Sequence, residues 1–158
     1  ETWKTSWIYP RLVFPGRVAE LMGAIAPELP GRLLATDSYA SSALLSYHAR
    51  RPVPMFGRGT AHARQDDIDT DWRAYAGKDL LVLRRQAPLL QDYQPYFRDI
   101  EVKKIQLSGG VYYAILGRGF DYEVYRARVL TDIRDRYYRI PAMLPVGRCY
   151  FFERYFPR

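Results

Sequence analysis

The sequence predicts an α/β fold built on an open, three-layer mixed sheet of the Rossmann-like kind, with a parallel βαβ core and an antiparallel hairpin. Between residues 32 and 56, two short apolar runs enclose an amphipathic segment, which is the order strand, helix, strand. The most apolar run of the chain, 80–83, follows after a long polar loop. Two extended runs within 101–116 flank Ser108-Gly109-Gly110, a pattern typical of a β-hairpin. These three observations favour a parallel core with an antiparallel pair at one side.

The elements of the first third of the chain can be predicted in order. Residues 1–15 combine aromatic side chains and prolines without a clear period, which indicates a connecting arm. A helix is expected over 16–26, ended by Pro27 and followed by a strand over 32–36. Asp37 or Ser38 is then expected to supply the N-cap of a helix over 39–49.

The later elements are less regular. Pro54 makes an interior position in a sheet unfavourable, so the strand over 53–56 is expected to lie at an edge or to be short at this end. A short helix is predicted within 86–97, and a turn over 117–120 before the longest helix, which Asp121 would cap. One domain of 158 residues results, with an arm (1–15), an α/β core (16–138) and an aromatic, basic C-terminal segment (139–158).

Bulk composition limits the classes of function. No apolar run reaches the length of about 20 residues that a membrane-spanning helix needs, and no signal peptide opens the chain. Because the chain does not begin with Met, we expect a piece of a longer or processed protein. A net charge of +7, carried mostly by arginine, suits a partner with phosphates, sugars or an anionic membrane surface; genomic base composition explains the same bias. Cys149 is the single cysteine, which excludes an internal disulfide.

Known catalytic patterns do not fit the sequence. Gly57-Arg58-Gly59 lacks the third glycine of a dinucleotide fingerprint, since residue 62 is His. The overlapping Asp-x-Asp triplets over 67–71 could chelate Mg²⁺, but acids ahead of a helix also serve as caps, and the capping interpretation is favoured. No Gly-x-Ser-x-Gly turn is present. We therefore predict no catalytic residue, no metal and no cofactor in this chain.

A polar loop over 57–79 is the candidate binding region. His62 stands close in sequence to Asp66 and Asp67, which could tune its protonation. In a parallel α/β sheet such a loop is expected at the carboxyl edge, where ligands usually bind. The arginines are interleaved with acids and no strand carries an aromatic RNA-binding motif, so nucleic acid is not favoured as a partner.

A series of short motifs runs through the middle of the chain. It begins with Ala35-Thr36-Asp37-Ser38-Tyr39 and continues through Ala43-Leu44-Leu45-Ser46-Tyr47 and Arg51-Pro52-Val53. The series then includes a loop at 57–59, a patch at 64–67 with Trp72, a strand phrase at 77–82 and a closing phrase at 117–122. Together these phrases resemble the segment that follows the last membrane helix in bacterial polytopic glycosyltransferases of the GT-C type, a family that includes relatives of the protein mannosyltransferases and of the aminoarabinose transferase that modifies lipid A. The patch differs from the family pattern in carrying extra Asp residues, and the chain runs longer at its C-terminus.

This resemblance implies a non-catalytic domain on the periplasmic side of the bacterial inner membrane, attached to a multi-pass enzyme. That enzyme takes its sugar from a polyprenyl-phosphate carrier, and its catalytic carboxylates belong to the membrane part of the same polypeptide. The domain would help to hold a glycan, lipid or protein acceptor, or the lipid-phosphate head group. The substrate-binding residues expected from the loop and from the aromatic positions are Tyr39, Arg58, His62, Arg64, Gln65, Asp66, Asp67 and Trp72.

Two alternatives stay open. Tyr39 and Trp72 offer rings for sugar stacking, yet their spacing also suits packing in the core. For the whole chain, the alternative is a free-standing cytoplasmic α/β protein that binds nucleotides or nucleic acid.

Overall fold

The structure is a computed structural model that describes residues 9–107, 110–145 and 147–157. Its centre is a four-stranded mixed sheet with the strand order β1-β2-β4-β3. Its strands are β1 (Arg32–Thr36), β2 (Asp79–Arg84), β3 (Phe97–Leu107) and β4 (Gly110–Phe120). β1 and β2 are parallel, whereas β4 is antiparallel to both β2 and β3. The predicted mixed α/β fold with an antiparallel hairpin is therefore confirmed, with the parallel part limited to one pair of strands.

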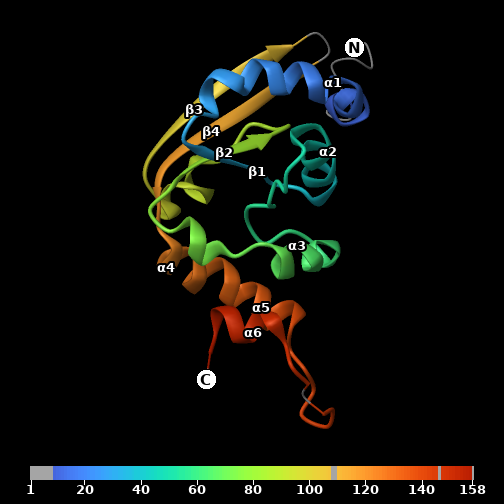
Figure 1. The fold of residues 1–158 in the computed structure, drawn as a ribbon, viewed down its shortest axis with the longest axis vertical. Helices are drawn as coiled ribbons and strands as arrows, with labels where there is room; N and C mark the ends of the chain where they lie inside the picture. Colours follow the sequence, from blue (N-terminus) through green and yellow to red (C-terminus); the bar gives the residue numbers. More distant parts are fainter. Residues whose placement is uncertain (1–8, 108–109, 146, 158) are drawn as a thin grey trace.

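Helices and turns connect these strands (Figure 1). The α-helices are α1 (Tyr9–Ile25), α2 (Tyr39–Ala49), α3 (Arg64–Asp69), α4 (Tyr122–Tyr125), α5 (Thr131–Tyr137) and α6 (Tyr150–Tyr155). The short 3₁₀ turns are η2 (Ala26–Glu28), η3 (Ala61–Ala63), η4 (Trp72–Tyr75), η5 (Leu90–Asp92) and η6 (Gln94–Tyr96). One π-helical segment, η7 (Arg126–Leu130), joins α4 to α5. None of the helices in the described ranges is long and apolar enough to cross a membrane.

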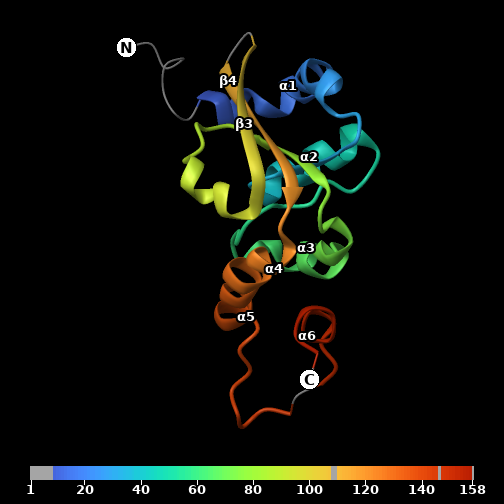
Figure 2. The ribbon, with the colours of Figure 1, turned by 90° about the vertical axis from the view of Figure 1, so that its left-hand side faces the viewer.

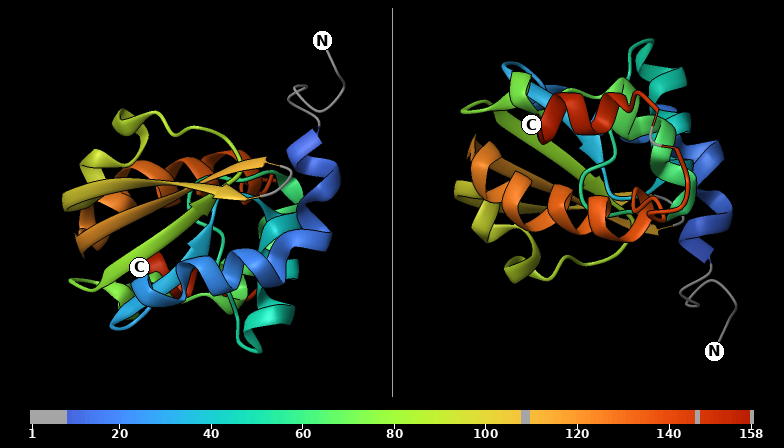
Figure 3. Two further views of the ribbon diagram at one scale, coloured as in Figure 1. Left: turned by 90° about the horizontal axis from the view of Figure 1, so that it is seen from above. Right: turned by 90° about the horizontal axis from the view of Figure 1, so that it is seen from below.

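The two faces of the sheet carry separate hydrophobic clusters. On one face α1 and α2 pack against the strands, with Leu21 and Leu45 fully buried among them, and Figure 3 shows α1 lying across this side. The opposite face carries an aromatic cluster that contains Phe56, Trp72 and Tyr125 together with residues of the C-terminal helices. Figure 2 shows those helices, α4 to α6, extending from one end of the sheet.

The capping predictions are confirmed at two helices. The side chain of Ser38 accepts a hydrogen bond from the N–H of Ser41 at the start of α2. Asp121 likewise accepts from the N–H of Val124 at the start of α4. Each cap satisfies a backbone donor that has no partner within its own helix.

Several predicted elements differ from the structure. The expected strand over 53–56 contributes a single bridge between Met55 and Thr36, because Pro54 has no N–H to extend the ladder. It lies beside β1 at the edge, as predicted. The helix α1 begins at Tyr9, so residues 9–15 of the expected arm are helical, while residues 1–8 lie outside the described range. The short helix expected within 86–97 is replaced by the turns η5 and η6.

The turn predicted over 117–120 is wrong, because these residues belong to β4. A Cβ atom on Gly117 would lie 2.5 Å from the ring of Phe97, so the glycine is required here for close packing across the hairpin. The C-terminal segment, for which no helix was predicted, forms α6, which buries Phe151 and Tyr155 one turn apart.

Candidate functional site

The polar loop between residues 57 and 78 crosses from one edge of the sheet to the other. It leaves the carboxyl edge after Phe56, whose N–H donates to the carbonyl of Thr36. Its far end is fixed by Gly77, whose N–H donates to the carbonyl of Phe120 at 2.8 Å. Phe120 ends β4, which runs antiparallel to β2, so this end of the loop lies at the opposite edge. Only the start of the loop therefore occupies the edge where the whole loop was predicted.

A buried ion pair holds the centre of this loop. Asp67 is 4% exposed, and its carboxylate lies 3.0 Å from the guanidinium of Arg64. The hydroxyl of Tyr138, which follows α5, donates to the same carboxylate at 3.3 Å. Arg64 also donates to the carbonyl of Arg58 at 2.8 Å, and its guanidinium lies 4.2 Å from the ring centre of Tyr137. The structure thus brings two predicted site residues together, but they are engaged with the protein itself.

The neighbouring carboxylate of Asp66 is turned toward the edge of the sheet. Its oxygen accepts a hydrogen bond from the N–H of Met55 at 3.0 Å. Asp66 thus supplies a hydrogen-bond partner for the backbone of residues 53–56, the segment beside β1. Burial raises the pKa of Asp66 to about 6, although the hydrogen bond from Met55 favours the charged form. Burial also raises the pKa of Asp67 to about 6, and the attraction of Arg64 opposes that shift only in part.

These raised pKa values predict that folding stability decreases as the pH rises. The folded chain holds both protons more tightly than the unfolded chain, in which the ordinary pKa of Asp is 3.8. Their stabilising contribution is therefore complete below that value and is lost as the pH rises through 6. We expect a loss of about 2 kcal/mol for each carboxyl over this interval. Urea unfolding of the protein and of an Asp66→Asn, Asp67→Asn variant at about pH 4 and about pH 7 measures it. A difference between the two proteins that is constant with pH would contradict the assignment.

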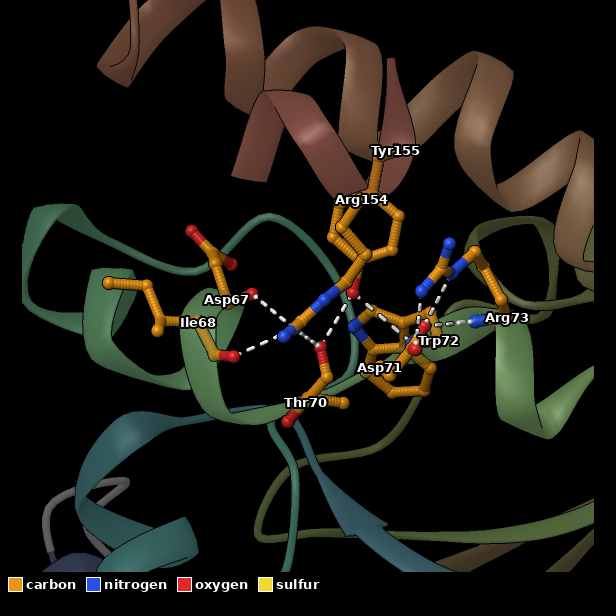
Figure 4. Close-up of polar contacts among 8 residues, drawn as sticks. All are labelled: Asp67, Ile68, Thr70, Asp71, Trp72, Arg73, Arg154 and Tyr155. Atoms are coloured by element: carbon orange, nitrogen blue, oxygen red, sulfur yellow. Dashed lines mark hydrogen bonds and ion pairs between the residues drawn. The ribbon is translucent and has the colours of Figure 1, made fainter. Parts of the chain in front are cut away.

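The C-terminal helix is fastened to the same loop by a second set of polar contacts (Figure 4). The guanidinium of Arg154 donates to the carbonyls of Ile68 and Thr70, at 2.7 Å in both cases, and more distantly to that of Asp67. The hydroxyl of Tyr155 donates to the carbonyl of Thr70 at 2.6 Å and accepts from the N–H of Trp72 at 3.1 Å. The last turn of α3 and the start of η4 therefore depend on residues more than eighty positions away.

Trp72 lies in the core. Its side chain is 2% exposed and its ring contacts those of Phe56, Tyr75, Phe120 and Tyr125, with centroid separations between 5.0 and 5.8 Å. A sugar cannot reach this ring, so its predicted stacking role is replaced by the packing role that the sequence also allowed. The neighbouring Asp71 caps η4 and pairs with Arg73 at 2.8 Å.

Three of the predicted loop residues lie at the surface, and we call Arg58, His62 and Gln65 the polar ridge. The side chain of Arg58 is 55% exposed and forms an ion pair with Asp132 of α5 at 3.2 Å. His62 is exposed in η3, and Gln65 is exposed in α3, where it donates to Asp69 at 3.1 Å. Arg64, which donates to the carbonyl of Arg58, joins this surface to the buried carboxylate of Asp67.

Tyr39 stands apart from the ridge. It is the first residue of α2 and is 45% exposed. Within the described part of the chain, no hydrogen bond, ion pair or ring contact joins it to the other predicted site residues. Its ring is free to meet a ligand, but the structure does not place it with the polar ridge.

The acidic triplets over 67–71 do not converge. Asp67 faces Arg64, Asp69 accepts from Gln65 and Asp71 faces Arg73. Among the described residues, no three His, Cys, Asp or Glu side chains are grouped so that they could hold a metal ion.

Sequence reasoning missed the residues of the C-terminal segment that support the loop. Tyr138, Arg154 and Tyr155 are all separated from their partners by at least seventy positions. The signal that could have found them is the spacing of Phe151 and Tyr155, which fits one face of a helix.

An open cleft of about 1350 Å³ lies between α5 and α6. It is lined by Arg134, Asp135, Tyr138, Arg139, Ile140, Gly147, Arg148, Cys149, Phe152, Glu153, Phe156 and Pro157.

Comparison of the chain with models of protein families, with curated proteins and with solved structures finds no match.

Proposed function

We propose that this chain is a non-catalytic domain of a bacterial membrane glycosyltransferase, placed on the periplasmic side of the inner membrane. The donor of that enzyme is a sugar carried on polyprenyl phosphate, and the acceptor is a glycan, a lipid such as lipid A, or a protein. The membrane part of the same polypeptide makes the glycosidic bond. The domain assists by binding the acceptor or the phosphate of the lipid carrier.

The strongest support comes from the way in which the phrases of the family resemblance meet in space. The phrases at 77–82 and 117–122 are far apart in sequence, yet they lie on adjacent strands. The carboxylate of Asp79 accepts from the N–H of Gly119 at 2.9 Å, and Gly77 pairs with Phe120 as described above. The first phrase joins them because Ala35 of β1 pairs with Val82 of β2. Stretches that each resemble the family only weakly thus lie in contact within a single structural unit.

The Rossmann-like, three-layer classification belongs to the same proposal. The parallel pair β1 and β2, with α2 between them in sequence, supports a βαβ core. In this view α1 and α2 form one outer layer, and α4 with the turns η4 to η6 forms the other.

The polar ridge is the surface that we propose for ligand contact. Arg58 offers a planar fork to a phosphate, while His62 and Gln65 offer ring and amide groups to sugar hydroxyls. The buried contacts of Arg64 and Asp67 hold the ridge in place before a ligand arrives. A surface held in this way loses little conformational entropy on binding.

Titration with farnesyl phosphate, followed by the amide signals of the ¹⁵N-labelled protein, tests this assignment. We expect saturable shifts at His62 and Gln65. Replacing Arg58 and His62 together by alanine should weaken binding about ten-fold or more, because both groups can donate to a charged phosphate. The matched control replaces His48, which is exposed on α2, and Arg51, which is exposed just after α2, and should leave binding unchanged.

The same titration distinguishes the alternative function. Saturable shifts with a nucleoside diphosphate or a single-stranded oligonucleotide, without shifts from farnesyl phosphate, would contradict the proposal and favour a nucleotide- or nucleic-acid-binding protein. Equal weakening by the ridge and control variants would also contradict it, since attraction by net charge alone would then explain the binding.

A further inference from the structure

The segment between α5 and α6 projects farther from the sheet than any other described part of the chain (Figures 1 and 2). Three apolar side chains along it are exposed: Met143 at 88%, Leu144 at 52% and Ile140 at 41%. We call these three residues the apolar tip. Exposed apolar side chains are common singly, but several together at the end of a projection indicate a surface that meets another apolar medium.

Part of the backbone of this tip needs no hydrogen bond from water. Pro141 and Pro145 have no N–H, and the N–H of Leu144 donates to the carbonyl of Pro141 at 2.9 Å. Entry into an apolar medium is costly mainly for unpaired backbone donors and acceptors. A turn with two prolines and an internal hydrogen bond reduces that cost.

Basic groups flank the tip. Between residues 134 and 150 the chain carries four arginines and a single acid, Asp135, which pairs with Arg134. Arg139 is exposed directly beside the tip, and Arg148, whose side chain is 75% exposed, pairs with Glu153 and lies over the ring of Tyr150. Tyr150 is itself 58% exposed. Apolar side chains bordered by arginines and an exposed tyrosine have the composition of a segment that lies at a membrane interface.

We propose that the apolar tip enters the head-group region of an anionic lipid bilayer, with Arg139 and Arg148 against the lipid phosphates. This deepens the proposed function, because it assigns the membrane contact of the domain to a particular segment. It rests on the exposure and charge of residues 139–145 and 147–150 and does not require the polar ridge. A bilayer fits better than a protein groove, since arginines surround apolar side chains that no other described part of the chain covers.

Partition of the protein between buffer and vesicles tests the proposal. The vesicles contain phosphatidylcholine, with or without phosphatidylglycerol, and sedimentation gives the bound fraction at low and high salt. We expect binding to anionic vesicles that weakens with salt. A Met143→Ser, Leu144→Ser variant should bind about ten-fold less tightly, because it loses two apolar side chains from the interface. Arg139→Gln and Arg148→Gln should each weaken binding about five-fold.

Matched controls use exposed residues elsewhere on the chain. Tyr47→Ser removes an apolar side chain that is 79% exposed on α2, and Arg51→Gln removes an exposed charge. Both should bind as the unaltered protein does. Circular dichroism confirms that each variant folds.

Equal binding to neutral and anionic vesicles, full binding by the tip variant, or no binding to either vesicle would overturn the proposal. The last outcome would indicate a protein partner for the tip. Titration with farnesyl phosphate in solution is unaffected by any of these results, so the ridge and the tip can fail separately.

Discussion

Replacing Trp72 by alanine is expected to lower the free energy of unfolding by about 3–5 kcal/mol, the range measured for large aromatic residues removed from protein cores. The ring is 2% exposed and touches four aromatic side chains that come from different parts of the chain. The cavity left by alanine cannot close, because those neighbours are also held by one another. Phe56, for example, contacts Tyr125 at a centroid distance of 5.0 Å.

Urea unfolding followed by circular dichroism measures this effect. Tyr47→Ala is the control, since this side chain is 79% exposed and its removal should change the free energy of unfolding by less than about 0.5 kcal/mol. A change of similar size in the two variants would show that Trp72 does not lie in the core.

The second large effect is expected for Arg154→Ala, which should destabilise the protein by about 2–3 kcal/mol. Its guanidinium donates to backbone carbonyls at the end of α3, and hydrogen bonds from a charged donor are stronger than neutral ones. The variant leaves the carbonyl of Ile68 without its donor, so we also expect faster hydrogen exchange across residues 66–72.

Arg148→Ala provides the matched control for Arg154. Arg148 belongs to the same segment but is 75% exposed, and among the described residues its ion pair is with Glu153. Its loss should cost less than about 1 kcal/mol, as for other surface ion pairs. If hydrogen exchange across residues 66–72 is the same in the Arg154→Ala variant as in the unaltered protein, α6 does not stabilise the end of α3.

Local signals in the sequence predicted much of the fold. Ser38 caps α2 as its residue type and position indicated, and the two glycines before Val111 indicated the hairpin. These features depend on residues within a few positions of one another. Gly117 shows the limit, because its role is set by the ring of Phe97, twenty positions earlier. A glycine required for close packing and a glycine required for a turn have the same appearance in the sequence.

The candidate site was harder to predict for the same reason. Asp67 and Trp72 lie in a polar stretch that is typical of an exposed loop, and for that reason the sequence indicated them as candidate binding residues. Their burial depends on Tyr138, Arg154 and Tyr155, which come from the far end of the chain. A pattern within one stretch cannot show which distant helix will cover it. Arg58, His62 and Gln65 are not covered by these helices and are exposed, and their role in binding stays a prediction.

The location of the native polypeptide tests the central claim most directly, namely that this chain is the periplasmic domain of a membrane enzyme. An antibody raised against the chain would be used on membranes washed with carbonate and on intact spheroplasts treated with protease. We expect a carbonate-resistant polypeptide much larger than the 18.5 kDa of this chain, whose epitope is destroyed by protease in intact spheroplasts. A polypeptide of about that mass, extracted by carbonate and protected inside the spheroplasts, would contradict the account.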